Sequence, residues 1–197
     1  MRGENLKIIM VRHGETDWNS QGRKQGHAET RLNSTGLVQA MQLAEQLKSR
    51  RVDEIFSSDL PRAMETAKEI NRFHNLKIEE SKLLREIDLG RCNGMTSGEM
   101  RKNFAEWGKL KDANPERTPY PDGESHIDVQ TRVKEFLNQL IKKNIETALI
   151  VSHQGFNRNF VQVLTDKTYR ELKNMDFHHN VIYEFDTKSK KLSQTKI

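Results

Sequence analysis

The chain contains two short apolar runs that each stop abruptly at polar residues. The first spans residues 6–11 and is followed by Arg12 and His13, and the second spans residues 147–152 and is followed by His153. Both runs are rich in β-branched residues and too short for a helix, so they predict buried strands. Open α/β sheets bind ligands at the carboxyl ends of their strands, which makes these polar residues the first candidates for a site.

The rest of the chain alternates between strand-like and helix-like patterns. Further strands are predicted at 52–57, 76–79 and 181–185, the last in a hairpin to Leu192. Helices are predicted after Asn33 or Ser34, after a capping residue in 57–59, after Ser97, after Ser125, and over 156–164. In the first of these helices the residues expected to face inward are Leu37, Ala40, Met41, Ala44 and Leu47. In the helix after Ser97 they are Met100, Phe104 and Trp107. This order predicts an α/β fold, a three-layer α/β/α sandwich with a mostly parallel sheet.

Length and loop composition suggest how the chain is divided. The 197 residues are enough for one α/β domain of ordinary size, spanning 1–197. Residues 19–35 are polar and predict a loop over the sheet edge. Residues 108–125 hold three of the four prolines, so we expect a lid or loop there.

Composition narrows the kinds of partner. The net charge of +5 favours anionic partners, but the densest basic run, 48–51, has no interleaved aromatic residue, which disfavours nucleic acid. No apolar stretch is long enough to span a membrane, and residues 1–5 do not begin a signal peptide, so we expect a cytoplasmic protein. The single cysteine, Cys92, excludes an internal disulfide and a thiolate metal site. A homodimer is compatible with the sequence but not indicated by it.

Four side chains predict a phosphate pocket if the two runs are neighbouring strands. Arg12, His13 and His153 would meet at one sheet edge, and Arg62 would join them from the first turn of a helix. A cation is unfavourable at that end of a helix unless it has a use. Arginines bind a phosphoryl group in bidentate fashion, and nearby positive charge keeps an imidazole unprotonated and nucleophilic. The alternative is a solvated strand end with a turn at Gly14, which is expected to let the backbone turn sharply and to leave room for a ligand.

These residues and several others resemble the motifs of the histidine phosphatase superfamily, whose branch 1 includes the cofactor-dependent phosphoglycerate mutases. The motifs occur in order along nearly the whole chain: Arg12-His13-Gly14-Glu15-Thr16 with Trp18-Asn19, Ser57-Ser58 with Arg62-Ala63 and Thr66-Ala67, Glu86 with Gly90, Gly123-Glu124-Ser125, and Val151-Ser152-His153 with Gly155 and Arg158. The resemblance implies a phosphoglycerate mutase-like fold and a phosphatase that acts through a phosphohistidine.

The resemblance also implies roles for individual residues. His13 would be the nucleophile, and Glu86 would protonate the leaving oxygen and then activate water. Arg12, Arg62 and His153 would hold the phosphoryl group of a small phosphorylated substrate, and phosphate would be the product. Asn19, Gln25 and Gly26 would line the substrate side, together with Gln154, which replaces a common glycine and would narrow the pocket or add an amide donor. No cofactor or metal is expected.

Several alternatives stay open at this point. Asp88 is a rival acid to Glu86, and Glu86 could instead pair with Arg85. A substrate with a second anionic group would suit the group formed by Lys24, His27, Arg31 and His179, but for each of them ordinary surface charge is the favoured alternative. A mutase or a non-catalytic phosphate-binding module would share the same residues, but the segment 92–121 is short for a mutase, which favours hydrolysis.

Overall fold

A computed structural model of the chain describes residues 6–197; residues 1–5, on which the signal-peptide expectation rests, lie outside the described residues. The strands are β1 (Lys7–Arg12), β2 (Glu54–Ser57), β3 (Ile78–Glu80), β4 (Thr147–Ser152), β5 (Val181–Asp186) and β6 (Lys191–Lys196). The helices are α1 (Asp17–Ser20), α2 (Ser34–Leu47), α3 (Pro61–Asn71), α4 (Ser97–Asn103), α5 (Ala105–Ala113), α6 (His126–Lys142), α7 (Gln154–Thr165) and α8 (Tyr169–Leu172), with short 3-10 turns at Lys82–Leu84 and Gly90–Cys92.

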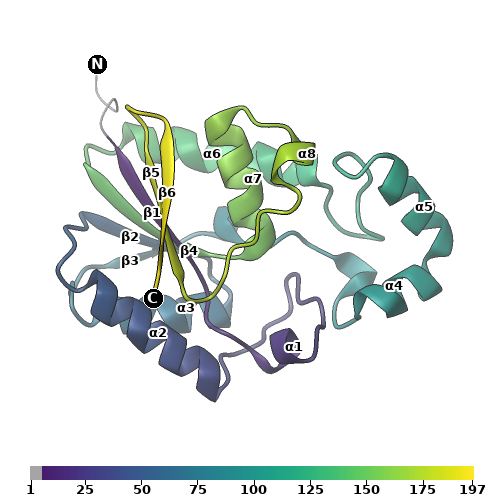
Figure 1. Ribbon diagram of the computed structural model, residues 1–197, viewed down its shortest axis with the longest axis horizontal. Helices are drawn as coiled ribbons and strands as arrows, with labels where there is room; N and C mark the ends of the chain where they lie inside the picture. The colour runs from purple at the N-terminus through teal and green to yellow at the C-terminus, as the bar shows by residue number, and fades with distance from the viewer. Residues whose placement is uncertain (1–5) are drawn as a thin grey trace.

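The strands form one six-stranded sheet between two layers of helices (Figure 1). The strand order is β3-β2-β4-β1-β5-β6, in which β3, β2, β4 and β1 run parallel and β5 and β6 run antiparallel to their neighbours. The predicted sandwich with a mostly parallel sheet is therefore confirmed. The two apolar runs are adjacent parallel strands, with Arg12 opposite Ser152 at their carboxyl ends.

Each face of the sheet carries its own apolar core. Ile8 and Met10 of β1 point into the core under α6 and α7, whereas Ile9 and Val11 point into the core under α2 and α3. This alternation follows from the two-residue period of a strand. Because both faces are covered, β1 is buried from residue 8 to residue 11, which explains why this part of its sequence is continuously apolar.

The predicted helix after Ser97 is in fact two helices. The backbone leaves the helical conformation at Phe104, where φ is −131° and ψ is 54°, so α4 ends at Asn103 and α5 runs from Ala105 to Ala113. The first helix is capped by Thr96, not by Ser97. The expected lid or loop over 108–125 is therefore helical in its first part. Figure 1 shows α4 and α5 projecting from the sandwich as a helical arm.

The inward face of α2 differs from the prediction. Leu37 and Met41 are 42% and 50% exposed, whereas the buried positions are Gly36, Ala40, Leu43, Ala44 and Leu47. The helix is rotated because Gly36 packs directly on the backbone that follows β1: a Cβ on Gly14 would lie 2.3 Å from the Gly36 carbonyl oxygen. The backbone makes no turn or bend at residues 13–16, so the sharp turn expected at Gly14 is also wrong, and the space beside Gly14 is taken by Gly36 and not by a ligand.

Smaller differences concern the ends of elements. The α3 helix has Leu60 as its N-cap, without a side-chain hydrogen bond, instead of a capping residue in 57–59. The third strand begins at Ile78 and not at residue 76, since the Asn71 side chain holds both backbone groups of Leu76 in the preceding turn. The predicted loop 19–35 begins inside the single turn of α1. Within residues 6–197, no helix combines the length and apolarity needed to cross a membrane.

Candidate active site

The two histidines that end the apolar runs lie side by side. The centroids of the His13 and His153 rings are 5.1 Å apart, because β1 and β4 are neighbours in register. Both side chains are almost completely buried, with exposed fractions of 3% and 0%. The sequence prediction that these residues meet at one sheet edge therefore agrees with the structure.

Hydrogen bonds define which nitrogen of His13 carries a proton. Nδ1 lies 2.7 Å from the Gly14 carbonyl oxygen, which can only accept, so Nδ1 is the protonated nitrogen. Nε2 then presents its lone pair and accepts from Arg62 Nε at 3.3 Å. Burial, reinforced by the charge of Arg62, lowers the pKa of His13 well below its ordinary value. The ring is therefore neutral at physiological pH, with Nε2 available as a nucleophile.

Arg62 connects this histidine to the loop that precedes α2. Its Nη2 donates to the Gly26 carbonyl at 2.8 Å, and its Nη1 donates to the Ala28 carbonyl at 2.7 Å and to Thr30 Oγ1 at 3.2 Å. The side chain is fully buried, and burial lowers its pKa to about 10, so the guanidinium stays charged at neutral pH. No carboxylate pairs with it among the described residues, which leaves its charge available to an anion in the site.

Arg12 is held from the other side of the two histidines. Its Nη1 donates to Gln154 Oε1 at 3.0 Å and to the Phe177 carbonyl at 3.1 Å, while its buried Nε has no partner among the described residues. Burial lowers its pKa to about 10. The Gln154 amide nitrogen donates to Asp176 Oδ1 at 2.6 Å. Gln154 lines the cavity, as predicted, but both ends of its amide group serve to orient Arg12.

His153 is buried without any polar contact. Neither Nδ1 nor Nε2 has a hydrogen-bond partner among the described residues. Burial, followed by the charges of Arg62 and Arg12, lowers its pKa well below the ordinary value. A buried polar group without a partner is costly, and such groups in native proteins usually mark a ligand or catalytic role. The unpaired nitrogens of His153 and Arg12 are suited to the oxygens of a phosphoryl group.

Glu86 reaches the site from the loop after β3. Its Oε2 accepts from the backbone N–H of Gly155 and its Oε1 from that of Phe156, each at 3.0 Å, and Oε1 also accepts from Ile87 N at 2.9 Å. The carboxylate therefore caps α7, whose own N-cap residue supplies no side-chain bond. Because Oε2 accepts a single bond, it keeps a lone pair that can hold a proton.

The alternatives to Glu86 have other partners. Arg85 forms a bidentate pair with Asp59, at 2.7 Å and 2.6 Å, and not with Glu86. Asp88 accepts from Gly90 N at 2.9 Å and lies 3.7 Å from His27 Nδ1. Glu86 lines the cavity beside His13, whereas Asp88 is not among the lining residues. The geometry thus favours Glu86 over Asp88 as an acid.

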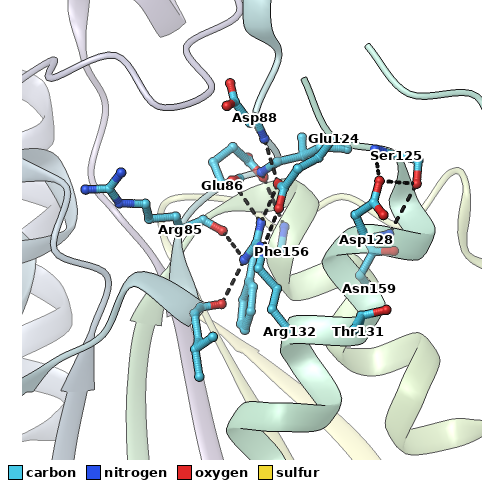
Figure 2. Close-up of polar contacts among 12 residues, drawn as sticks. Arg85, Glu86, Asp88, Glu124, Ser125, Asp128, Thr131, Arg132, Phe156 and Asn159 are labelled. Atoms are coloured by element: carbon cyan, nitrogen blue, oxygen red, sulfur yellow. Dashed lines mark hydrogen bonds and ion pairs between the residues drawn. The ribbon is translucent and has the colours of Figure 1, made fainter. Parts of the chain in front are cut away.

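Arg132 of α6 holds the loop that carries Glu86, and the sequence analysis missed it. Figure 2 shows its guanidinium at the centre of a set of bonds to Glu124 and to backbone carbonyls. The distances are 2.9 Å and 3.0 Å to the two Glu124 oxygens, 2.7 Å to the Leu83 and Arg85 carbonyls, and 3.0 Å to the Glu86 carbonyl. Glu124 in turn accepts from Asp88 N at 2.8 Å. The only sequence signal was an arginine on a helix that begins next to the Gly123-Glu124-Ser125 motif.

The residues predicted to line the substrate side do line the cavity, and two of their side chains also make hydrogen bonds to neighbouring residues of the protein. Asn19, Gln25 and Gly26 all line the cavity. The Asn19 carboxamide oxygen accepts from Thr16 N at 3.1 Å in the capping box of α1, and the Gln25 oxygen accepts from Thr16 Oγ1 at 3.0 Å. Gly26 has a φ of +47°, and a Cβ there would lie 2.2 Å from Asn93 Oδ1, so this position requires glycine.

The four residues considered for a second anionic group separate in the structure. Only Lys24 among them lines the cavity. Arg31 is exposed and pairs with Glu65 at 2.6 Å, and His27 bonds to the Glu86 carbonyl at 2.8 Å. His179 lies beside the nucleophile, with ring centroids 5.5 Å apart, and bonds through Nδ1 to the His13 carbonyl. The four therefore do not form one anion site.

A cavity of about 790 Å³ is lined by Arg12, His13, Arg62 and Glu86 and continues under the helical arm. Among residues 6–197, no three His, Cys, Asp or Glu side chains gather closely enough to hold a metal ion. Fold and site together define an α/β protein with a buried cationic pocket for an oxyanion, built around two neutral imidazoles at the carboxyl ends of adjacent strands.

Comparisons with known proteins agree with this class. The family model of the histidine phosphatase superfamily (branch 1) matches residues 8–196, and the chain belongs to this superfamily. It is 36% identical over 149 residues to phosphoserine phosphatase 1 of Hydrogenobacter thermophilus, covering 75% of this chain and 71% of that protein. It is 32% identical over 184 residues to phosphoglycerate mutase-like protein 4 of Arabidopsis thaliana, covering 91% and 80%. The structure of a mycobacterial glucosyl-3-phosphoglycerate phosphatase with VO3 superimposes with a TM-score of 0.84 at 26% identity, covering 97% and 98%.

Proposed function

We propose that the chain hydrolyses phosphate monoesters of small metabolites through a covalent phosphohistidine on His13. The observation that carries this proposal is the hydrogen-bonded state of His13: Nδ1 is committed to the Gly14 carbonyl, so Nε2 is unprotonated, and its lone pair accepts only the 3.3 Å bond from Arg62 Nε, a bond that attack on phosphorus would replace. A buried neutral imidazole of this kind is an activated nucleophile.

In the first step, Nε2 attacks phosphorus and the bond to the leaving oxygen breaks. Arg12, Arg62 and His153 bind the three other phosphoryl oxygens, which stabilises charge in the transition state. Glu86 donates the proton on Oε2 to the leaving oxygen. In the second step, Glu86 takes a proton from a water molecule whose oxygen attacks phosphorus, the N–P bond breaks, and phosphate and neutral His13 are released. Acid and base catalysis by such a group is worth roughly 10²–10⁴ in rate.

Three observations support this assignment of roles. The buried nitrogens of His153 and Arg12 have no partner among the described residues, which suits them to phosphoryl oxygens. The pKa values of both histidines lie well below the ordinary value because of burial and the neighbouring arginines, so neither ring is protonated at pH 7. The Glu86 carboxylate lines the same cavity.

The test is hydrolysis of p-nitrophenyl phosphate between about pH 5 and pH 8, together with mass spectrometry of the acid-quenched and the base-quenched enzyme. We expect a phosphoryl adduct on His13 that survives base and is lost in acid, and at least a 10³-fold loss of turnover in His13→Ala. His74→Ala, which removes an imidazole beyond the far end of α3, serves as the matched control. Absence of wild-type hydrolysis throughout this range would overturn the proposal in favour of a binding module.

Two further measurements, with a chelator and with an added bisphosphate, distinguish the proposed hydrolysis from a metal-dependent reaction and from a mutase. Hydrolysis that persists in excess chelator is expected, since the proposed steps use protein side chains alone, and full chelator sensitivity would contradict them. Strong stimulation by an added bisphosphate, with transfer to a hydroxyl in place of water, would indicate a mutase.

A further inference from the structure

The cavity is much larger than the phosphate pocket, and its far half is lined by basic side chains. From the histidines it continues beneath the helical arm, between α5 and the first turns of α6 and α7. The basic lining residues of this half include Lys111 from α5, His126 from α6 and Arg158 from α7, and the lining also contains Lys173 and the carboxylates of Asp112 and Asp176. Three elements that are distant in sequence therefore bring cations and a proton donor to one space, separate from the atoms that would hold the phosphoryl group.

Lys111 is a half-buried amine without a counter-ion. Its Nζ donates to the Thr118 carbonyl at 2.7 Å and lies 4.7 Å from the centre of the Tyr120 ring. No carboxylate lies within 4.0 Å of it among residues 6–197. Lys109, two residues earlier on the same helix, is exposed and pairs with Glu106 at 2.8 Å. Burial lowers the pKa of Lys111 to about 8, so the uncompensated charge is costly in the unliganded protein.

Arg158 and His126 complete the cluster with unused donors. Arg158 donates through Nε and Nη2 to the Met175 carbonyl, at 3.1 Å and 3.0 Å, and its Nη2 lies 3.5 Å from Asp176 Oδ1, whereas Nη1 has no hydrogen-bond partner among the described residues. His126 Nδ1 accepts from Asn159 Nδ2 at 3.0 Å, so the ring proton is on Nε2. Burial and the charges of Lys111 and Arg158 lower the pKa of His126 to about 4. His126 is therefore a neutral N–H donor in a positive field.

We propose that Lys111, Arg158 and His126 form a second anion-binding subsite, which takes a carboxylate or a further phosphate group of the same substrate. The inference rests on the proposed function, because the substrate's monoester phosphate would occupy the pocket at His13. An anion would supply the counter-charge that Lys111 lacks and would accept from Arg158 Nη1 and His126 Nε2. The natural substrate would then be a phosphorylated acid or a bisphosphate and not a neutral phosphorylated alcohol.

The experiment uses non-hydrolysable probes, so that it does not depend on turnover. Binding of ω-carboxyalkyl phosphonates with three to eight carbons is measured by calorimetry at pH 7 and compared with alkyl phosphonates of matched length. Wild-type protein is expected to bind the carboxylate compound at least tenfold more tightly at one chain length, which is about 1.4 kcal/mol. In Lys111→Met this advantage should fall to twofold or less, in Lys111→Arg it should persist, and in Lys109→Met it should be unchanged.

Each other outcome has a definite meaning. If both series bind but the carboxylate gives no advantage at any length, the subsite is overturned and the phosphate pocket stands. If Lys109→Met removes the advantage as fully as Lys111→Met, general surface charge is responsible and the subsite is again overturned. If neither series binds, the phosphate pocket, the proposed function and the subsite all fail together.

Discussion

The Nε of Arg62 lies 3.3 Å from Nε2 of His13, so a permanent cation touches the nitrogen that would attack phosphorus. The same guanidinium bonds to the carbonyls of Gly26 and Ala28, which ties the loop before α2 to the nucleophile. One side chain thus lowers the pKa of His13 and shapes the wall of the cavity, and in the proposed mechanism it would also supply charge for the phosphoryl group. This explains why the first turn of α3 carries a cation despite the unfavourable helix dipole.

Removing this charge should raise the pKa of His13. Burial is the largest cause of its depression and Arg62 the next, so in Arg62→Gln the pKa should move toward the ordinary value of 6.5. We also expect kcat/KM for p-nitrophenyl phosphate to fall by roughly 10²–10³, as for the loss of a transition-state donor. The titration is measured by NMR of the histidine Cε1 protons, with Arg31→Gln as control because Arg31 is exposed. An unchanged His13 titration in Arg62→Gln would contradict the electrostatic role.

The sequence was sufficient to predict the sheet edge because strand patterning is local. The apolar runs before His13 and His153 are short and β-branched, which predicts two strands in the interior of a mostly parallel sheet, whereas their adjacency was only a condition of the prediction and is shown by the pairing of β1 with β4. A cation in the first turn of α3 was likewise readable from Pro61 and Arg62. These features follow from neighbouring residues alone.

Features set by contacts between distant segments were not predicted. The exposure of the Leu37 side chain depends on the close approach of Gly36 to Gly14. The interruption between α4 and α5 occurs at Phe104, where no proline or glycine in the sequence predicts it. The clamp by Arg132 joins a helix to carbonyls more than 45 residues away. Its helical pattern was visible, but the pattern does not reveal which backbone atoms a polar side chain will meet.

Loosening the Arg132 clamp should affect the acid step selectively. Arg132→Met removes the bonds to the Leu83, Arg85 and Glu86 carbonyls, so the Glu86 carboxylate should lose its fixed position. Alkyl phosphates need a proton on their poor leaving group, whereas p-nitrophenyl phosphate scarcely does. We expect kcat/KM, which reports the steps up to departure of the leaving group and not the later attack of water, to fall about tenfold or more for alkyl phosphates and much less for the aryl ester.

The same pair of substrates tests whether Arg132 acts through Glu86. Glu86→Gln should show the same selectivity with a larger effect, and the double variant should be no worse than Glu86→Gln alone. Arg72→Met, which removes an exposed arginine paired with Glu69, is the control. Equal losses on both esters in Arg132→Met would indicate a general structural defect and not a positioning role.

A methyl group at Gly155 should displace the same carboxylate by another route. A Cβ there would lie 2.4 Å from Glu86 Oε1, far inside contact distance. Gly155→Ala should therefore reduce kcat/KM for alkyl phosphates by at least tenfold while kcat/KM for p-nitrophenyl phosphate falls less. Gly108→Ala is the matched control, because no atom lies within 4 Å of its Cβ position and alanine should stabilise α5 by about 0.5–1 kcal/mol. Full activity in Gly155→Ala would show that the Glu86 position is not critical.

The preference for a second anion should disappear as the pH rises past the pKa of Lys111. That pKa is lowered to about 8 by burial, so the amine is charged at pH 7 and mostly neutral at pH 9.5. Tyr120, whose pKa is raised by burial, does not change charge in this interval, and His126 is neutral throughout it. The ratio of kcat/KM for a carboxyalkyl phosphate to that for the matched alkyl phosphate should therefore fall with an inflection near pH 8. Lys111→Arg should keep the ratio high up to pH 9.5, since its guanidinium stays charged, and an identical inflection in that variant would assign the titration to another group.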